Sequence, residues 1–194
     1  MRTKICGITS LKDAMAAIDA GADALGFVFY KRSPRYIDEE KAQNIIAQLP
    51  PFIEKVALFV NEDASTIDTV CQKVGATLAQ LHFEAPQELY RELQTPHIKV
   101  IRAKSADDLT RYSNEYRLVD AYCEAYGGAG KRINIEWFEN IDCSKIILAG
   151  GLNPSNVAAL KTYGFYGVDV SSGVEVSHGK KEIQKVKEFI KNAQ

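Results

Sequence analysis

The sequence contains few cysteines, and their spacing forms no motif. Its four cysteines are Cys6, Cys71, Cys123 and Cys143, and none belongs to a Cys-x-x-Cys pair. A disulfide framework or a metal site built on cysteine is therefore not expected. The chain also lacks an excess of either charge, because its formal net charge is -1. Without a global basic field, nucleic acid is not an expected partner.

Long hydrophobic runs are also missing. The longest apolar stretch, from Ala24 to Tyr30, is much shorter than a membrane-spanning helix. The N-terminal residues do not form a charged and then apolar leader. We therefore expect a cytoplasmic protein without a membrane partner. No linker or low-complexity segment divides the sequence, so one domain is predicted over residues 1–194.

What the sequence does contain is eight short apolar runs that alternate with segments of helical spacing. The predicted strands are Thr3–Ile8, Ala24–Phe29, Lys55–Val60, Leu78–His82, Ile98–Ala103, Arg117–Ala121, Lys145–Ala149 and Gly167–Val170. Helical spacing is clearest in Ser10–Ala20, Asp38–Leu49, Asp63–Val74, Pro154–Tyr163 and Lys181–Ala193. Eight such units favour a closed (β/α)8 TIM barrel over an open doubly wound sheet, because closure leaves no unpaired edges. The chain is slightly shorter than most such barrels, so trimmed helices and loops are expected.

Polar residues end several of the predicted strands. In a (β/α)8 barrel these ends form the active-site face, which makes Cys6, His82, Arg102, Asp120 and Asp169 candidate site residues. Cys6 precedes a glycine, which lets a ligand approach the backbone. An aspartate that ends an apolar strand needs a partner, a proton or a function. The alternatives are an inert buried thiol and a carboxylate that only caps a loop.

Two glycine-rich turns predict a phosphate site. Gly150 and Gly151 follow the seventh strand, and Ser171, Ser172 and Gly173 follow the eighth. Such turns expose backbone N–H groups toward an anion, and the corresponding loops bind phosphate in many barrels. We therefore expect a small phosphorylated molecule as the ligand.

Two further segments are candidates for binding a substrate. The loop Tyr122–Arg132 contains Gly128 and Lys131 but lacks the first glycine and the hydroxyl residue of a Walker loop, so it is interpreted as a lid. The basic turn Lys31–Tyr36 contains Arg35, which is able to donate two hydrogen bonds to a carboxylate. The alternative for this turn is a solvated basic surface.

Several motifs, in order along the chain, resemble the phosphoribosylanthranilate isomerase family of tryptophan biosynthesis. They are Lys4-Ile5-Cys6-Gly7-Ile8-Thr9, Gly26-Phe27-Val28-Phe29, Ser33-Pro34-Arg35, Phe59-Val60-Asn61, Gln80-Leu81-His82, Gly150-Gly151-Leu152-Asn153 and Asp169-Val170-Ser171-Ser172-Gly173-Val174-Glu175. The resemblance implies a cofactor-free Amadori rearrangement of N-(5-phosphoribosyl)anthranilate to 1-(2-carboxyphenylamino)-1-deoxyribulose 5-phosphate. It implies that Cys6 is the general base, Asp120 the general acid and Arg35 the partner of the anthranilate carboxylate. It places the phosphate at Gly150, Gly151, Ser171, Ser172 and Gly173.

We also assign His82, Gly128 and Asp169 to substrate binding and expect no metal ion. A monomer or a homodimer is expected. Phe83 stands where the family usually has glycine, so a bulky ring is predicted to crowd the end of the fourth strand.

Two alternative functions remain open. A related phosphosugar isomerase of histidine biosynthesis is expected to use paired carboxylates in place of a thiol and a carboxyl group. A non-catalytic phosphosugar-binding barrel has no need of an acid and a base.

Overall fold

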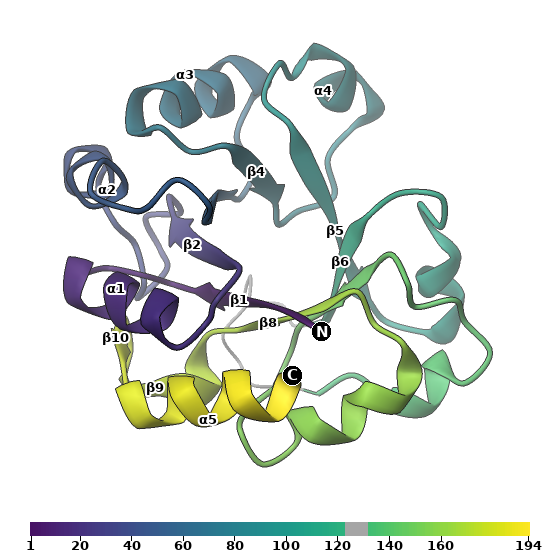
Figure 1. Cartoon of the computed structure of the whole chain (residues 1–194). Helices are drawn as coiled ribbons and strands as arrows, with labels where there is room; N and C mark the ends of the chain where they lie inside the picture. Colours follow the sequence, from purple (N-terminus) through teal and green to yellow (C-terminus); the bar gives the residue numbers. More distant parts are fainter. Residues whose placement is uncertain (123–131) are drawn as a thin grey trace.

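The computed structural model describes residues 1–122 and 132–194. Within these ranges, eight parallel strands close into a barrel in chain order, and helices pack around the outside (Figure 1). The strands are β1 (Arg2–Cys6), β2 (Ala24–Val28), β3 (Glu54–Phe59), β4 (Leu78–Leu81), β5 (His97–Ala103), β6 (Arg117–Ala121), β7 (Ile146–Leu148) and β8 (Gly167–Val170). Each overlaps a predicted strand, which confirms the (β/α)8 barrel.

The helices are short, and several are 3-10 helices. The α-helices are α1 (Leu11–Asp19), α2 (Glu39–Ile46), α3 (Ala64–Val74), α4 (Gln87–Glu92) and α5 (Ile183–Ala193). The 3-10 helices are η1 (Ala106–Thr110), η2 (Ile135–Phe138), η3 (Val157–Tyr163) and η4 (Ser172–Val174), and a small hairpin joins β9 (Glu175–Ser177) to β10 (Lys180–Lys181). The first three α-helices begin after Ser10, Asp38 and Asp63, whose side chains accept hydrogen bonds from backbone amides of the first turn.

In the segment Pro154–Tyr163, where helical spacing was found, the helix is the 3-10 helix η3 and it begins only at Val157. The side chain of Asn156 accepts a hydrogen bond from the Asn153 amide and donates one to the Gly151 carbonyl. These bonds fix a turn where the first helical turn was expected.

The core has two compartments. The larger one combines helix residues with alternate strand residues, so it lies between the barrel and the helices that surround it. The other strand residues fill the barrel interior as two small apolar clusters. One contains Cys6, Val28, Leu58 and Val60, and the other contains Ile98, Val100, Leu118 and Ala149. Four buried polar side chains also come from the barrel strands or their ends: Lys4 on β1, Gln80 on β4, His82 directly after β4 and Asp169 on β8. The barrel interior is therefore partly polar, which identifies the region where a site can form.

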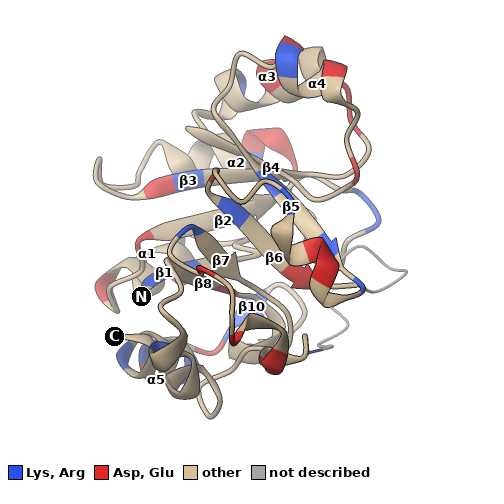
Figure 2. Ribbon diagram, turned by 90° about the vertical axis from the view of Figure 1, so that its right-hand side faces the viewer, with Lys and Arg blue, Asp and Glu red and all other residues tan. Residues whose placement is uncertain are grey.

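The surface carries charges of both signs. Figure 2 shows Lys and Arg positions interspersed with Asp and Glu positions along the ribbon of helices, strands and loops. Among the described residues, no helix is long and apolar enough to cross a membrane.

Candidate active site

Cys6 and Lys4 occupy alternate positions of β1 and face the same small residue of β2. A Cβ atom at Gly26 would lie 2.8 Å from Cys6 Sγ and 3.1 Å from Lys4 Nζ. Lys4 Nζ also donates a hydrogen bond of 2.8 Å to Asp169 Oδ1 on β8. Lys4 is thus a site residue that the sequence analysis missed. The available signal was a lysine in the predicted strand two positions before Cys6, on the same face as the thiol, because a buried ammonium needs a partner.

Burial and two nearby cations have opposite effects on the pKa of the Cys6 thiol. Burial raises its pKa, the charges of Lys4 and Lys181 lower it, and Asp169 adds a further increase, so that the pKa is raised overall. Burial disfavours the ammonium form of Lys4, but its interactions with Asp169 and Cys6 outweigh burial and raise the pKa of Lys4. Lys4 therefore stays charged, and its field favours the thiolate of Cys6.

Asp120, near the end of β6, is a largely buried carboxyl group, 13% exposed, next to the buried imidazole of His82. Its Oδ2 lies 3.5 Å from His82 Nε2. Burial and then the charge of Asp169 raise the pKa of Asp120 to about 7, against smaller opposing effects that include Arg102 and Lys4. Burial, followed by the same two cations, lowers the pKa of His82 to about 3. Near neutral pH the site thus holds a carboxyl group that exchanges its proton readily, beside a neutral imidazole.

Arg35 lies in the buried part of the site, but its guanidinium already binds a carboxylate. Its Nε and Nη2 donate to the two oxygens of Glu175, both at 2.8 Å. Lys181 Nζ donates to the same carboxylate at 2.8 Å. Burial disfavours the charge of Glu175, but these two cations outweigh it and lower the pKa of Glu175. The predicted two-pronged contact of Arg35 is therefore made within the chain, by a glutamate that the sequence analysis did not assign to the site.

The predicted phosphate loops lie against each other. A Cβ atom at Gly173 would overlap the carbonyl oxygen of Leu152, so glycine is required for this close approach. Within the part of the chain that the structure describes, the backbone amides of Gly150, Gly151, Ser172 and Gly173 donate no hydrogen bond. The hydroxyl of Ser171 is buried and likewise lacks a partner there, and it lies close to Gly7 and Arg35. These free donors can bind an anion.

The structure describes the surroundings of Phe83 but does not describe Gly128. The ring of Phe83 is only 5% exposed and packs into the large cluster between barrel and helices. Its bulk therefore fills the outer core, which makes Phe83 a packing residue. Gly128 and the rest of 123–131 lie outside the described residues. The described residues contain no cluster of three His, Cys, Asp or Glu side chains able to hold a metal ion.

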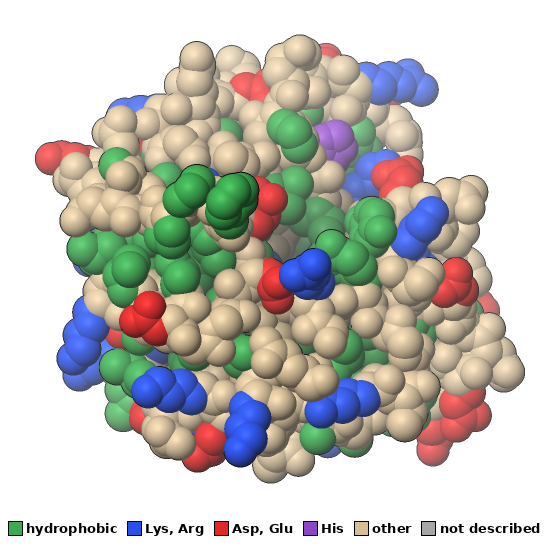
Figure 3. Space-filling model, viewed as in Figure 1, with side chains coloured by type: hydrophobic (Ala, Val, Ile, Leu, Met, Phe, Trp, Pro, Cys, Tyr) green, Lys and Arg blue, Asp and Glu red, His purple; other side chains and the backbone are tan. Residues whose placement is uncertain are grey.

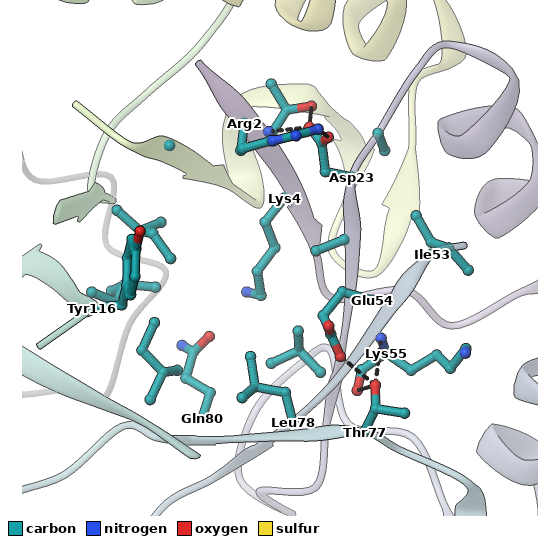
Figure 4. Close-up of a pocket in the computed structure, with 18 of the residues that line it drawn as sticks. Arg2, Lys4, Asp23, Ile53, Glu54, Lys55, Thr77, Leu78, Gln80 and Tyr116 are labelled. Atoms are coloured by element: carbon teal, nitrogen blue, oxygen red, sulfur yellow. Dashed lines mark hydrogen bonds and ion pairs between the residues drawn. The ribbon is translucent and has the colours of Figure 1, made fainter. Parts of the chain in front are cut away.

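A cavity of about 640 Å³ opens at the opposite end of the barrel, where the strands begin. Figure 3 shows this face, hollowed near its centre with hydrophobic side chains around the hollow. Lys4 and Gln80 line the cavity, and Figure 4 shows both side chains extending into its middle. The buried polar residues of the barrel thus lie between this cavity and the strand ends that carry Cys6 and Asp120.

Comparison with known proteins identifies the family. A family model described as N-(5'phosphoribosyl)anthranilate (PRA) isomerase matches residues 3–192. The N-(5'-phosphoribosyl)anthranilate isomerase of Sulfurovum sp. (strain NBC37-1) is 60% identical over 193 residues, covering 100% of this chain and 98% of that protein.

Two solved structures are similar over the full length of the chain. One is a phosphoribosyl anthranilate isomerase in complex with reduced 1-(o-carboxyphenylamino)-1-deoxyribulose 5-phosphate, at 40% identity and a TM-score of 0.84. The other shows monomers generated from the dimeric enzyme of Thermotoga maritima, at 38% identity and a TM-score of 0.84. Each comparison covers 100% of this chain and 98% of the other. The chain belongs to the N-(5'-phosphoribosyl)anthranilate isomerase family.

Proposed function

We propose that this chain converts N-(5-phosphoribosyl)anthranilate to 1-(2-carboxyphenylamino)-1-deoxyribulose 5-phosphate in tryptophan biosynthesis, with Asp120 as general acid and Cys6 as general base. Membership of the isomerase family supports the reaction. One observation carries the assignment of the two residues. The largely buried carboxyl group of Asp120 and the buried thiol of Cys6 both lie within the field of the Lys4–Asp169 ion pair.

The acid step requires a proton on the oxygen of the ribose ring. With its pKa raised to about 7, Asp120 is partly protonated near neutrality and gives up its proton easily. Protonation breaks the bond between the ring oxygen and C1 of the ribose, and the anilino nitrogen becomes an iminium. The neighbouring carboxylate of Asp169 favours the protonated acid before this step.

The base step removes the proton from C2 of the opened sugar. The iminium makes this proton acidic, and the thiolate of Cys6 accepts it, which leaves an enolamine. Tautomerisation of the enolamine gives the ketone at C2 and restores the amine. Burial works against the thiolate and keeps the pKa of Cys6 raised, and the ammonium of Lys4 offsets part of this effect.

The remaining residues hold the two ends of the substrate. The free amides of Gly150, Gly151, Ser172 and Gly173, together with Ser171, are proposed to bind the phosphate. Glu175 orients Arg35 and leaves Nη1 of its guanidinium free of hydrogen bonds among the described residues, so Nη1 is the group available to the anthranilate carboxylate. His82, Asp169 and Gly128 stay predictions for contacts to the sugar and to the anthranilate.

Turnover of N-(5-phosphoribosyl)anthranilate, followed by loss of its fluorescence, tests the proposal. We expect Cys6→Ser and Asp120→Asn each to lower kcat by about a hundredfold or more, because acid or base catalysis is worth about that much. Cys143→Ser and Asp19→Asn are matched controls, since Cys143 precedes β7 and the exposed Asp19 ends α1, at the end of the barrel where the strands begin. A variant of Cys6 or Asp120 that keeps near-normal kcat contradicts the role given to that residue. Binding without turnover by the unmodified chain contradicts the reaction.

The oligomeric state and the cellular location of the chain are also predicted from its relatives. A dimeric relative is known, and a monomer or a homodimer is expected for this chain. Sedimentation equilibrium distinguishes the two. The family's biosynthetic role supports the expectation of a cytoplasmic location.

A further inference from the structure

Gln80 is a buried polar residue that the proposed chemistry does not use. It lies on β4, two positions before His82, so both side chains face the barrel interior. Gln80 is 1% exposed, and its Nε2 lies 3.2 Å from His82 Nδ1. A buried amide requires an explanation in terms of its hydrogen-bond partners.

The charge of Lys4 favours one orientation of the Gln80 amide, whose oxygen has no hydrogen-bond partner among the described residues. Figure 4 shows the carboxamide and the Lys4 side chain extending into the same space, with the carboxamide oxygen on the side of Lys4. A cation attracts the amide oxygen and repels the amide N–H groups. The nitrogen of Gln80 is thereby held toward His82, where it donates a hydrogen bond to Nδ1.

This hydrogen bond selects one tautomer of His82. A neutral imidazole carries its proton on only one nitrogen, and His82 is neutral because burial lowers its pKa to about 3. An amide nitrogen is only able to donate, so with Gln80 Nε2 turned toward Nδ1 the contact requires the proton of the neutral ring to be on Nε2. That nitrogen is buried with no hydrogen-bond partner among the described residues, and it lies 3.5 Å from Asp120 Oδ2. The His82 N–H group therefore faces the carboxyl group of Asp120.

We propose that Gln80 is a positioning residue for the acid. It holds His82 in the Nε2–H tautomer, so that His82 stabilises the Asp120 carboxylate that forms as Asp120 gives up its proton. The inference rests on the acid role proposed for Asp120. An N–H group that is oriented before the reaction stabilises the developing negative charge without reorganisation. The opposite tautomer would present a bare nitrogen and retain the proton on Asp120.

Other charged groups also act on Asp120. Asp169 on β8 favours its protonated form, while Arg102 on β5 and Lys4 on β1 favour the carboxylate. These three charges are present in both tautomers of His82. The tautomer is thus a separate influence on the acid, and Gln80 controls it.

The tautomer is measured directly by 15N NMR of the chain labelled in its histidine rings. The chain has three histidines, and the signal lost in His82→Asn assigns His82. We expect a protonated Nε2 and an unprotonated Nδ1 from about pH 5 to about pH 8. A bare Nε2, or an imidazolium in this range, overturns the proposal whatever the enzyme's turnover.

Two variants then test the effect on catalysis. Gln80→Met removes the donor, and we expect kcat to fall by about tenfold, with KM within about twofold and a higher apparent pKa for Asp120 in the pH profile of kcat. Gln80→Glu replaces the donor with an acceptor, which favours a hydrogen bond from Nδ1–H, so it should reverse the tautomer and lower kcat further. Gln72→Met on α3 is the exposed control and should match the unmodified chain.

The result for Gln80→Met separates a positioning role from a packing role. A loss of kcat with the tautomer and the pH profile unchanged would show packing only and overturn the proposal, as would an unchanged kcat. Failure of the proposed function is recognised separately, because Asp120→Asn would then retain turnover even where the NMR spectrum shows the expected tautomer.

Discussion

Folding raises the pKa of Asp120 and lowers the pKa of His82. We predict that the pH dependences these two groups give to the free energy of unfolding cancel in mildly acidic solution. Asp120 has an ordinary pKa of 3.8 that folding raises to about 7. From about pH 4.5 to about pH 6 the folded state holds this proton and the unfolded state does not, so stability falls as pH rises. His82 has an ordinary pKa of 6.5 that folding lowers to about 3. Over the same interval the unfolded state holds the proton, so stability rises with pH.

Each group contributes a slope of about 1.4 kcal/mol per pH unit, or about 2 kcal/mol over the interval. Measured against the unmodified chain, the free energy of unfolding of Asp120→Asn should therefore increase by about 2 kcal/mol from pH 4.5 to pH 6. His82→Asn should show a decrease of similar size, and the double variant should show neither. Urea unfolding at the two pH values gives these free energies. Variants whose pH dependence runs parallel to that of the unmodified chain would refute the reasoning.

Three further substitutions test other contacts. Glu175→Gln leaves two buried cations without their anion, so urea unfolding should show a loss of about 3–5 kcal/mol, whereas Glu115→Gln at an exposed ion pair should cost less than about 1 kcal/mol. Gly173→Ala forces the two phosphate loops apart, and steady-state kinetics should show KM raised by about tenfold or more. Gly164→Ala is its control, because open space surrounds that glycine and only left-handed backbone strain of about 1 kcal/mol is added. Phe83→Gly should cost about 3–5 kcal/mol in urea unfolding, and a stability unchanged by losing this ring would contradict its packing role.

The barrel could be predicted from the sequence because its signals are local. Apolar runs with regular spacing specify strands, and glycines after helices specify the turns between them. The 3-10 helix η3 could not be predicted in this way. The hydrogen bonds of Asn156 to Asn153 and Gly151 depend on how the loop after β7 folds, whereas helical spacing reports only which face of the segment is buried.

A site residue could be predicted from the sequence where its position at the end of a strand is enough to place it in the site. Cys6, Asp120 and Asp169 come together because parallel strands bring their carboxyl ends to one face. The partner of Arg35 was not predictable, since Glu175 lies 140 positions away and meets it only through the closure of the barrel. Gln80 and His82 are two positions apart in the sequence, but the orientation of the Gln80 amide depends on the charge of Lys4 on β1.

The Lys4–Asp169 pair connects the site's chemistry to the stability of the barrel. Both side chains are less than one-tenth exposed, and replacing such a buried pair with apolar residues is often neutral or stabilising by about 1–4 kcal/mol. The double variant Lys4→Met with Asp169→Leu should therefore unfold at an equal or higher urea concentration. It should also lose kcat by about a hundredfold or more, because Cys6 loses its nearest cation and Asp120 loses the anion that helps keep it protonated. Lys4→Met alone leaves Asp169 buried and unpaired and should cost about 3–5 kcal/mol. A double variant that is both much less stable and still active would mean that the pair serves the fold, and the reasoning that links it to Cys6 and Asp120 would fail.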